Sequence, residues 1–375
     1  MSIISEVEVY PLNIPFIRTF KISRGYIGAP GKPGEHVYLK IVTKDGEVGW
    51  GEARPNPAWM YETIESVYST LKKYVTPILI GKSPFEINKI LIEMDQKLTP
   101  VVSSGQPFAK SAVDIALHDL LGKILGVPLH SLLGGKLVDY VEMSALISGT
   151  VDTVGDYAKE MKDKGYRFFK LKIMGDPEKD SQLINALLEK VPDAKIWLDA
   201  NQAYNSYTYG LLLRKIDDID NIVVIEQPVP TYDFLGLKRL REKSRFPIAA
   251  DESLFSHHDL LKLVWMDAID MLVLKIAKSG IKTSHKIYSL AEATGIACMG
   301  SGMTESGVGL SASTHVFSTM NIVAPVDTNG PQFLKDLLIS GLEINGAMIK
   351  VPDKPGLGIK VKEDKVEEYK VTLKV

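Results

Sequence analysis

The pattern of hydrophobic and polar positions changes near residue 141 of this 375-residue chain. From there on, short apolar runs alternate with amphipathic stretches that have helical spacing. The apolar runs that predict strands are Val141–Ile147, Phe168–Ile173, Ile196–Ala200, Ile222–Ile225, Ile248–Ala250, Met271–Ile276, Ile296–Met299 and Ile322–Val326. Eight strands that alternate with helices are typical of an α/β fold of the (β/α)8 barrel type. A doubly wound open sheet would give the same alternation, so it is the main alternative.

The sequence motifs that accompany a nucleotide-binding open sheet are incomplete. The nearest match to G-x-G-x-x-G is Gly300-Ser301-Gly302, which is followed by Met303-Thr304-Glu305 and therefore lacks the third glycine. The sequence also contains no P-loop and no nucleophile elbow. The barrel is therefore the favoured interpretation.

The residues before the barrel predict a smaller domain of mixed strands and helices. A first strand is expected at Ile4–Leu12, and two more are expected at Val37–Val42 and Val48–Ala53, on either side of an Asp-Gly turn. Helical spacing follows at Tyr61–Ile78, Pro84–Leu98 and Pro107–Leu125. The stretch Pro15–Gly34 is rich in glycine and proline and predicts a long loop, a kind of segment that often acts as a lid.

Charged residues end five successive predicted strands of the barrel. They are Lys170 and Lys172, Asp199, Glu226, Asp251, and Lys275. From Lys172 onward they are separated by 27, 27, 25 and 24 residues, and each interval is one strand–helix unit. A single acid after a strand is usually a helix cap, but active-site residues of barrels also come from the C-terminal ends of strands. Since buried charge is costly unless it is paired or bound to a metal, five in succession predict one functional rim.

The residue types on this rim point to a definite chemistry. Three carboxylates on adjacent strands form an oxygen-only site that suits Mg²⁺ or Mn²⁺ rather than zinc. The lysines on the flanking strands become usable acids and bases when a nearby cation lowers their pKa. The arrangement suits removal of a proton alpha to a carboxylate, with the metal stabilising the enolate. A non-catalytic barrel would leave this cluster without a purpose and remains a remote alternative.

The composition excludes several other classes of protein. The 44 basic residues nearly balance the 46 acidic ones, which argues against a nucleic-acid partner. The single cysteine, Cys298, rules out an intramolecular disulfide or a cysteine zinc cluster. The N-terminus does not resemble a signal peptide and no apolar run is long enough to span a membrane, so a cytoplasmic protein without a membrane partner is expected.

Taken together, these motifs resemble the enolase superfamily, and within it the muconate lactonizing enzyme subgroup. That subgroup includes muconate cycloisomerases, dipeptide epimerases, N-acylamino acid racemases and o-succinylbenzoate synthases. The motifs that carry the resemblance are Phe169-Lys170-Leu171-Lys172, Leu198-Asp199-Ala200-Asn201, Ile225-Glu226-Gln227-Pro228, Ala250-Asp251-Glu252-Ser253 and Leu274-Lys275-Ile276-Ala277-Lys278-Ser279-Gly280. Further similarity lies at Phe108–Ala112, Gly302–Gly307 and Pro355–Gly358, so nearly the whole chain is covered.

The resemblance implies a modified (β/α)8 barrel with an N-terminal α+β capping domain. We expect residues 1–125 to form the capping domain, 126–345 the barrel, and 346–375 a segment that returns to the capping domain. Asp199, Glu226 and Asp251 would bind Mg²⁺, with Mn²⁺ as a substitute. Lys172 and Lys275 would be the acid and base, and Lys170 would help to neutralise the bound carboxylate. Asn201 and Glu252 would be electrostatic partners of these residues and would not bind the metal themselves.

The resemblance leaves the reaction and the substrate open. The expected activity is that of an isomerase, either a cycloisomerase or a racemase or epimerase, acting on a small-molecule carboxylate. The alternative is a lyase, such as an o-succinylbenzoate synthase or an acid-sugar dehydratase. Dipeptide epimerases of the subgroup have two acids after the last strand, whereas this chain has Asp327 and Asn329. Further candidates for substrate contact are Met303, Glu305, Arg24 and Tyr26. Many family members are oligomers, so a homo-oligomer, a dimer or an octamer, is expected.

Overall fold

The computed structural model describes residues 2–101 and 103–374. Its central element is a curled sheet of seven parallel strands in the order β13-β12-β11-β10-β9-β8-β7. The strands are β7 (Ala145–Ile147), β8 (Phe168–Lys172), β9 (Lys195–Asp199), β10 (Ile222–Glu226), β11 (Ile248–Ala250), β12 (Met271–Lys275) and β13 (Ala297–Ser301). Neighbours in the sheet follow one another in the sequence, which is the arrangement of a (β/α) barrel and not of a doubly wound sheet.

The predicted eighth strand is not formed, which corrects one part of the barrel prediction. Val326 makes an isolated bridge to Met143, and Asp327 makes one to Ser301 at the end of β13. The predicted run Ile322–Val326 includes Pro325, which has no N–H group to donate to a strand ladder. The edges of the curled sheet are therefore joined by single bridges rather than by a regular strand. The first predicted run is also divided, into β6 (Tyr140–Glu142) and β7.

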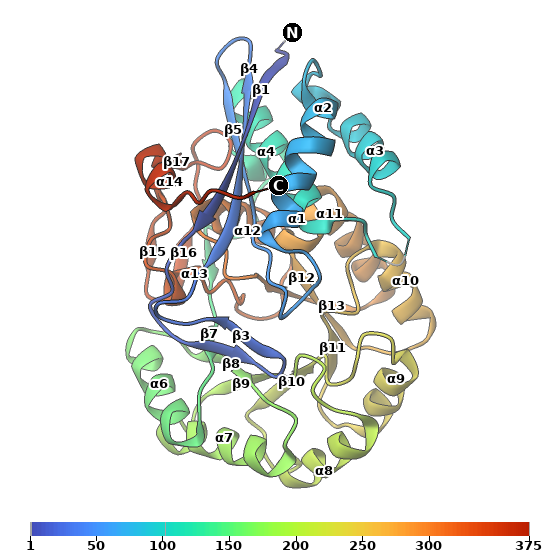
Figure 1. The fold of residues 1–375 in the computed structure, drawn as a ribbon. Helices are drawn as coiled ribbons and strands as arrows, with labels where there is room; N and C mark the ends of the chain where they lie inside the picture. Colours follow the sequence, from blue (N-terminus) through green and yellow to red (C-terminus); the bar gives the residue numbers. More distant parts are fainter. Residues whose placement is uncertain (1, 102, 375) are drawn as a thin grey trace.

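Helices lie on the outside of the sheet, and most of them bury one apolar face. They are α6 (Val151–Asp163), α7 (Pro177–Lys190), α8 (Ser206–Ile216), α9 (Phe234–Lys243), α10 (His257–Trp265), α11 (Ile276–Thr294) and α12 (Gly307–Ser318). In α6 the buried residues include Val154, Tyr157, Ala158 and Met161, a spacing that places them on one side of the helix. In Figure 1 the helices α6 to α10 surround the lower part of the sheet, and the N-terminal domain lies above it.

The N-terminal domain contains a three-stranded antiparallel sheet, β1 (Ile4–Asn13), β4 (Glu35–Thr43) and β5 (Val48–Ala53). The predicted hairpin with the Asp-Gly turn is confirmed. Helix α4 (Pro107–Leu125) has the predicted bounds and packs directly on β5. A Cβ atom at Gly51 would lie 1.9 Å from the carbonyl oxygen of Ala112, so this close packing requires glycine.

The other two predicted helices are interrupted. The first becomes α1 (Ile64–Ser69), a π-helical segment η1 (Thr70–Val75) and α2 (Thr76–Leu79). The second begins with a single 3-10 turn, η2 (Pro84–Glu86), and continues as α3 (Ile87–Lys97). A short helix, α5 (Leu129–Leu132), follows α4 and leads into the barrel.

The expected loop at residues 15–34 contains a small hairpin, which corrects the prediction of an unstructured segment. Its strands are β2 (Phe20–Ile22) and β3 (Gly25–Gly28), and they pair antiparallel. The hairpin extends from the N-terminal domain across the barrel sheet (Figure 1). The backbone N–H of Lys21 donates to the Ser148 hydroxyl at 3.1 Å, and Ser23 Oγ donates to the carbonyl oxygen of Asn201 at 3.0 Å. The hairpin is thus held against loops at the carboxyl ends of β7 and β9.

The C-terminal residues contact both parts of the molecule. After α13 (Gly330–Phe333) come β14 (Ile339–Ser340), β15 (Ile344–Asn345), β16 (Met348–Lys350), β17 (Lys360–Val361) and α14 (Glu363–Tyr369). Strand β16 pairs with β6 beside the barrel. Helix α14 packs on β1, and the N–H of Val371 donates to the carbonyl oxygen of Pro11 at 2.9 Å.

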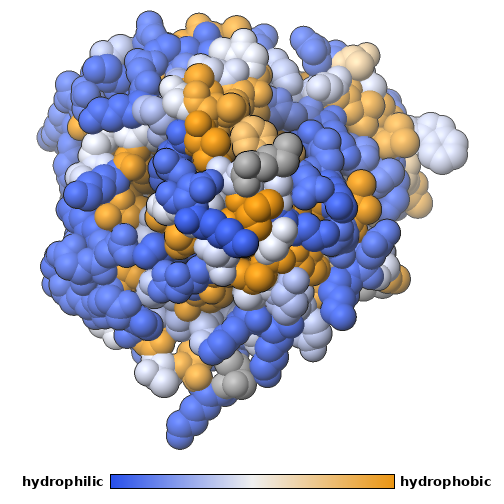
Figure 2. Space-filling model, turned by 90° about the horizontal axis from the view of Figure 1, so that it is seen from above, coloured by the Kyte–Doolittle hydropathy of each residue, from blue (hydrophilic) through white to orange (hydrophobic). Residues whose placement is uncertain are grey.

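The surface on the side of the N-terminal domain is mainly polar (Figure 2). In this view, apolar patches are scattered between charged side chains. Within residues 2–101 and 103–374, no helix combines the length and the apolar character needed to cross a membrane.

Candidate active site

The charged residues at the strand ends meet inside the mouth of the barrel. Lys170 and Lys172 occupy alternate positions of β8 and both point inward, as their equal parity predicts. The Lys170 ammonium lies 3.0 Å from Asp199 Oδ2 and 2.9 Å from Glu226 Oε2. All of these side chains are buried. The regular spacing in the sequence therefore corresponds to one compact cluster.

Each of the flanking lysines is paired with the carboxylate on the neighbouring strand. Lys172 Nζ lies 2.6 Å from Asp199 Oδ2, and Lys275 Nζ lies 2.7 Å from Asp251 Oδ2. Because β8 and β12 are each next to an edge strand of the curled sheet, the two lysines approach from opposite sides. The strands that carry the three acids lie between them.

A fourth buried lysine, to which the sequence analysis assigned no role, belongs to the same cluster. Lys278 Nζ donates to Asp251 Oδ1 at 2.6 Å and to the carbonyl oxygen of Asp251 at 2.7 Å. Burial lowers the pKa of Lys278, and the attraction of Asp251 only partly opposes this. Lys275 ends β12 and Lys278 lies in the first turn of α11, so the signal that could have identified Lys278 is a second lysine directly after the strand end.

The cluster holds more negative than positive groups. Five carboxylates, those of Asp199, Glu226, Asp251, Glu252 and Asp327, are buried here with the four lysines Lys170, Lys172, Lys275 and Lys278. Burial raises the pKa of Glu226 well above its usual range, and the neighbouring Asp199 adds to this. Burial also raises the pKa of Glu252 to about 7, with Asp251 and Asp199 contributing. A bound cation would favour the ionised form of both acids and compensate their buried charge.

The two outer acids behave differently because lysines surround them. Burial acts to raise the pKa of Asp199, but Lys170 and Lys172 outweigh it and the pKa is lowered. Burial likewise acts to raise the pKa of Asp251, but Lys275 and Lys278 outweigh it and the pKa is lowered. In turn, burial acts to lower the pKa of Lys275, and Asp251 outweighs it and raises the pKa. These ion pairs hold both acids in the charged form that binds a metal.

The oxygen atoms that fit a metal come from three adjacent side chains. Glu226, Asp251 and Glu252 each offer one carboxylate oxygen, and these oxygens lie within 4.8 Å of one another. Glu252 Oε2 is buried and has no hydrogen-bond partner among the described residues. Such a set of hard oxygen donors fits Mg²⁺ or Mn²⁺.

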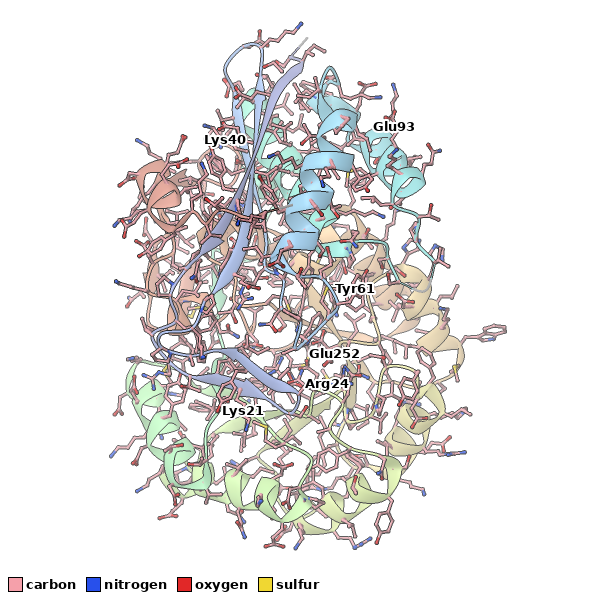
Figure 3. All side chains as sticks on the ribbon, in the orientation of Figure 1. Lys21, Arg24, Lys40, Tyr61, Glu93 and Glu252 are labelled. Carbon is pink, nitrogen blue, oxygen red and sulfur yellow. The ribbon has the colours of Figure 1, made fainter. Side chains whose placement is uncertain are left out.

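Asp199, which the sequence analysis placed among the ligands, lies beside this group and not within it. Its Oδ2 is held by the two lysines of β8, and its Oδ1 accepts the N–H of Asn201 at 3.0 Å. Asn201 joins the two sets, because its Oδ1 accepts from Lys172 at 3.0 Å and its Nδ2 donates to Glu252 Oε1 at 3.0 Å. Figure 3 labels Glu252 in the barrel mouth and Lys21 and Arg24 on the hairpin.

A pocket lies between the barrel mouth and the hairpin and is lined by residues of both. Its apolar lining consists of Phe20, Ile22, Ile27, Trp59, Leu146 and Met303. Its other lining residues are Lys172, Lys275, Gly302, Thr304, Asp327 and Asn329. The Lys275 ammonium lies 4.5 Å from the centre of the Trp59 ring, and the Lys172 ammonium lies 5.6 Å from that of Phe20. The pocket has a volume of about 20 Å³, room for about one water molecule, so its lining has to rearrange before a substrate can enter.

The residues predicted after the last strands are close to this pocket. Asp327 Oδ2 lies 3.0 Å from Lys170 Nζ, and Asp327 Oδ1 accepts from the Asn329 amide at 2.8 Å. Met303 lines the pocket. Glu305 is buried beside it, and one of its oxygens accepts the N–H of Met303 at 2.7 Å. Burial raises the pKa of Glu305 to about 7.

The hairpin residues Arg24 and Tyr26 point elsewhere. The Arg24 guanidinium donates to Gln202 Oε1 at 2.8 Å, and Tyr26 is 62% exposed. Neither is among the lining residues, to which the hairpin contributes Phe20, Ile22 and Ile27 instead. Strand alternation would have identified these inward positions if the segment had been recognised as a hairpin.

Both parts of the chain match known families. Residues 153–365 match the model described as enolase C-terminal domain-like, and residues 17–134 match that of the mandelate racemase / muconate lactonizing enzyme N-terminal domain. The N-succinyl-L-Arg/Lys racemase of Bacillus cereus is 34% identical over 374 residues, 98% of each chain. A chloromuconate cycloisomerase of Cupriavidus necator is 33% identical over 337 residues, 88% of this chain and 90% of that one.

Solved structures agree with these matches. The Bacillus cereus N-succinyl Arg/Lys racemase superposes with a TM-score of 0.93 at 32% identity and covers 99% of both chains. The Bacillus subtilis L-Ala-D/L-Glu epimerase, solved with its substrate, gives a TM-score of 0.89 at 29% identity over 95% of this chain and 98% of that one. The chain belongs to the enolase superfamily, in its muconate lactonizing enzyme subgroup.

Proposed function

We propose that this isomerase removes a proton alpha to the carboxylate of a small substrate and delivers another proton to the opposite face of the same carbon. The observation that carries the proposal is that Lys172 and Lys275 line one pocket from opposite sides of the barrel. The reaction is therefore a racemisation or an epimerisation. Relatives named as racemases and epimerases support this choice.

The residues of the cluster have different roles in this reaction. The neutral amine at one of the two pocket lysines takes the α-proton at Nζ, and the ammonium of the other lysine delivers a proton to the opposite face. Lys170 lies behind them, in contact with Asp199, Glu226 and Asp327, and adds positive charge next to the bound carboxylate. The hairpin covers the pocket and keeps water away from the carbanion that forms when the α-proton is removed.

The acids of β10 and β11 prepare the site for a divalent metal. Glu226, Asp251 and Glu252 would offer its oxygen ligands, and Asp199, paired with Lys172, lies beside them. Bound Mg²⁺ or Mn²⁺ supplies positive charge that stabilises the enolate. The ion pairs of Lys172 with Asp199 and of Lys275 with Asp251 place both ammonium groups beside these acids.

Exchange of the α-proton in D₂O tests the proposal. With Mg²⁺ present, the protein should replace the α-hydrogen of its substrate by deuterium, as seen by NMR, and should equalise the two enantiomers. Lys172→Ala and Lys275→Ala should each abolish the interconversion of enantiomers. Lys179→Ala is the matched control, because that lysine lies on α7 with a side chain that is 75% exposed. Full racemisation by either pocket variant would contradict the assignment.

Cycloisomerisation is the second candidate, favoured by relatives named chloromuconate cycloisomerase. That reaction needs only one of the two lysines. Retention of full turnover in one of the two pocket variants, together with conversion of a muconate, would select it.

A further inference from the structure

Helix α11, which follows Lys275 directly, is broken at Gly280. This residue has φ 69° and ψ 176°, a backbone conformation outside the helical region that glycine adopts without strain. The break divides the helix into a short first segment, residues 276–279, and a longer second segment, residues 281–294. The short segment follows Lys275 and contains Lys278, and both of these lysines pair with Asp251. Its position therefore affects where both ammonium groups lie.

Helix α4 of the N-terminal domain packs on α11 (Figure 1). Ser111 on α4 is buried, and its hydroxyl donates to the carbonyl oxygen of Ile276 at 2.6 Å. Ile276 is the residue next to Lys275 in the chain. A side chain of the N-terminal domain thus holds the barrel backbone directly beside one of the two pocket lysines.

Asp114, one helical turn after Ser111, caps the second segment of α11. Its Oδ2 accepts from the N–H of Lys282 at 2.8 Å. The N–H groups of a first helical turn have no partner within the helix, and Gly280 has no side chain to accept from them. Asp114 supplies that carboxylate from the other domain. A Cβ atom at Gly280 would lie 2.7 Å from Asp114 Oδ2, so the close approach of the two helices also requires glycine here.

These contacts bear on one of the pocket lysines and not on the other. Lys172 ends β8, on the opposite side of the barrel from β12. Its ammonium donates to Asp199 at 2.6 Å and to Asn201 at 3.0 Å, which belong to β9 and to the loop that follows it. A disturbance at α4 should therefore displace Lys275 and leave Lys172 in place.

We propose that Ser111 and Asp114 are positioning residues for Lys275, so that the N-terminal domain sets the geometry of one acid/base group of the barrel. The inference rests on the proposed function, because it acts through the proton transfers that Lys275 makes. A reacting group that is misplaced by about 1 Å can cost about 100-fold in rate. Loss of the Ser111 hydroxyl should therefore lower kcat for the enantiomer that Lys275 deprotonates, with little change in KM.

Crystal structures of the wild type and of Ser111→Ala, both loaded with Mg²⁺, test the positioning without a substrate. Residues 275–279 should shift in the variant, and the Lys275 ammonium should move relative to its place in the wild type. The Lys172 ammonium should keep its wild-type place and serves as the internal reference. A Lys275 side chain that superposes on that of the wild type would overturn the inference.

Proton exchange of separate enantiomers distinguishes a positioning role from a general loss of stability. N-succinyl-L-arginine and N-succinyl-D-arginine are the probes, each incubated in D₂O with Mg²⁺ and followed by NMR. Ser111→Ala should slow α-proton exchange of one enantiomer by about 10- to 100-fold and that of the other by less than about twofold. The slowed enantiomer should be the one that Lys275→Ala no longer exchanges. Equal rates for the variant and the wild type, or equal slowing of both enantiomers, would overturn the inference.

The matched control is Ser311→Ala. Ser311 is buried on α12 and donates to the carbonyl oxygen of Leu357 at 2.7 Å, so its loss removes the same kind of hydrogen bond away from β12. This variant should exchange both enantiomers at the wild-type rate. Absence of exchange by the wild type would count against the proposed function, whereas the place of Lys275 in the crystal structures still decides this inference.

Asp114 is tested by a pair of variants. Asp114→Ala removes the cap of the second segment and should slow the same enantiomer as Ser111→Ala. Asp114→Asn keeps an acceptor oxygen for the N–H of Lys282 and should restore most of the rate. A folded Asp114→Ala protein that exchanges both enantiomers at the wild-type rate would overturn the role of Asp114.

Discussion

Replacement of Glu52 should uncouple the N-terminal domain from the loop that precedes α12. Glu52 lies on β5, and its carboxylate accepts from the N–H of Ser306 at 2.7 Å, from the Ser306 hydroxyl at 2.8 Å and from the N–H of Gly309 at 2.8 Å. His36 Nδ1 lies 2.7 Å from the same side chain. An acid from one domain thus caps a helix of the other.

The expected loss of stability follows from the backbone N–H groups that lose their hydrogen-bond partner. In Glu52→Ala, the two backbone N–H groups at the start of α12 lose their partner in a fully buried place. Each unsatisfied buried donor costs about 1–3 kcal/mol, so the free energy of unfolding should fall by about 4 kcal/mol. Glu52→Gln keeps one acceptor oxygen and should cost about half as much. The loop with Met303 and Thr304 lines the pocket next to this cap, so KM should rise in the folded Gln variant.

Urea unfolding measures the effect, followed by circular dichroism and by tryptophan fluorescence. Coincident midpoints of the two signals are needed before a free energy is extracted. Glu47→Ala is the matched control, because Glu47 lies in the exposed turn before the same strand and should change stability by less than about 0.5 kcal/mol. A loss below about 1 kcal/mol for Glu52→Ala would refute the reasoning, since it would mean that the helix N-terminus finds other partners.

Three further predictions concern the metal, the buried lysine and a buried acid. Protein dialysed against a chelator should be inactive, regain activity with Mg²⁺ or Mn²⁺ and melt at a higher temperature with either ion, whereas full activity in excess chelator would exclude the metal. Lys278→Ala leaves Asp251 short of a partner and should lower the free energy of unfolding by about 3–5 kcal/mol, against little change for the exposed Lys286→Ala on the same helix, as measured by urea unfolding. Burial raises the pKa of Glu62 to about 7, so the native state binds this proton more tightly than the unfolded state, and the resulting stability is complete below pH 4.5 and is lost as the pH rises through 7. Over this pH range the free energy of unfolding of the wild type should fall by about 3 kcal/mol relative to that of Glu62→Gln. Parallel pH profiles of the two proteins would contradict this.

The sequence predicts the parts of this molecule that local patterns determine. Helix α4 has its predicted bounds because Pro107 can open a helix and Gly126, with a positive φ, can end one. Strand parity places Lys170 and Lys172 together on the inside of the barrel. The spacing of one strand–helix unit between charged residues predicts the common rim.

Other features depend on contacts that no local pattern shows. The apolar run at 322–326 has strand composition, yet only isolated bridges form there. The strands β2 and β3 are too short to stand out from a loop rich in glycine and proline. The lysines around the five buried acids determine which carboxylate oxygens lie close together. Glu252 therefore belongs to the oxygen group, and Asp199 lies beside it.

The central claim is that Lys172 and Lys275 serve opposite faces of one α-carbon. It is tested most directly by α-proton exchange of the separate enantiomers of the substrate in D₂O with each single alanine variant. One variant should exchange only the L enantiomer and the other only the D enantiomer, while neither interconverts them. Exchange of the same enantiomer by both variants, or racemisation at the wild-type rate by either, would contradict the account.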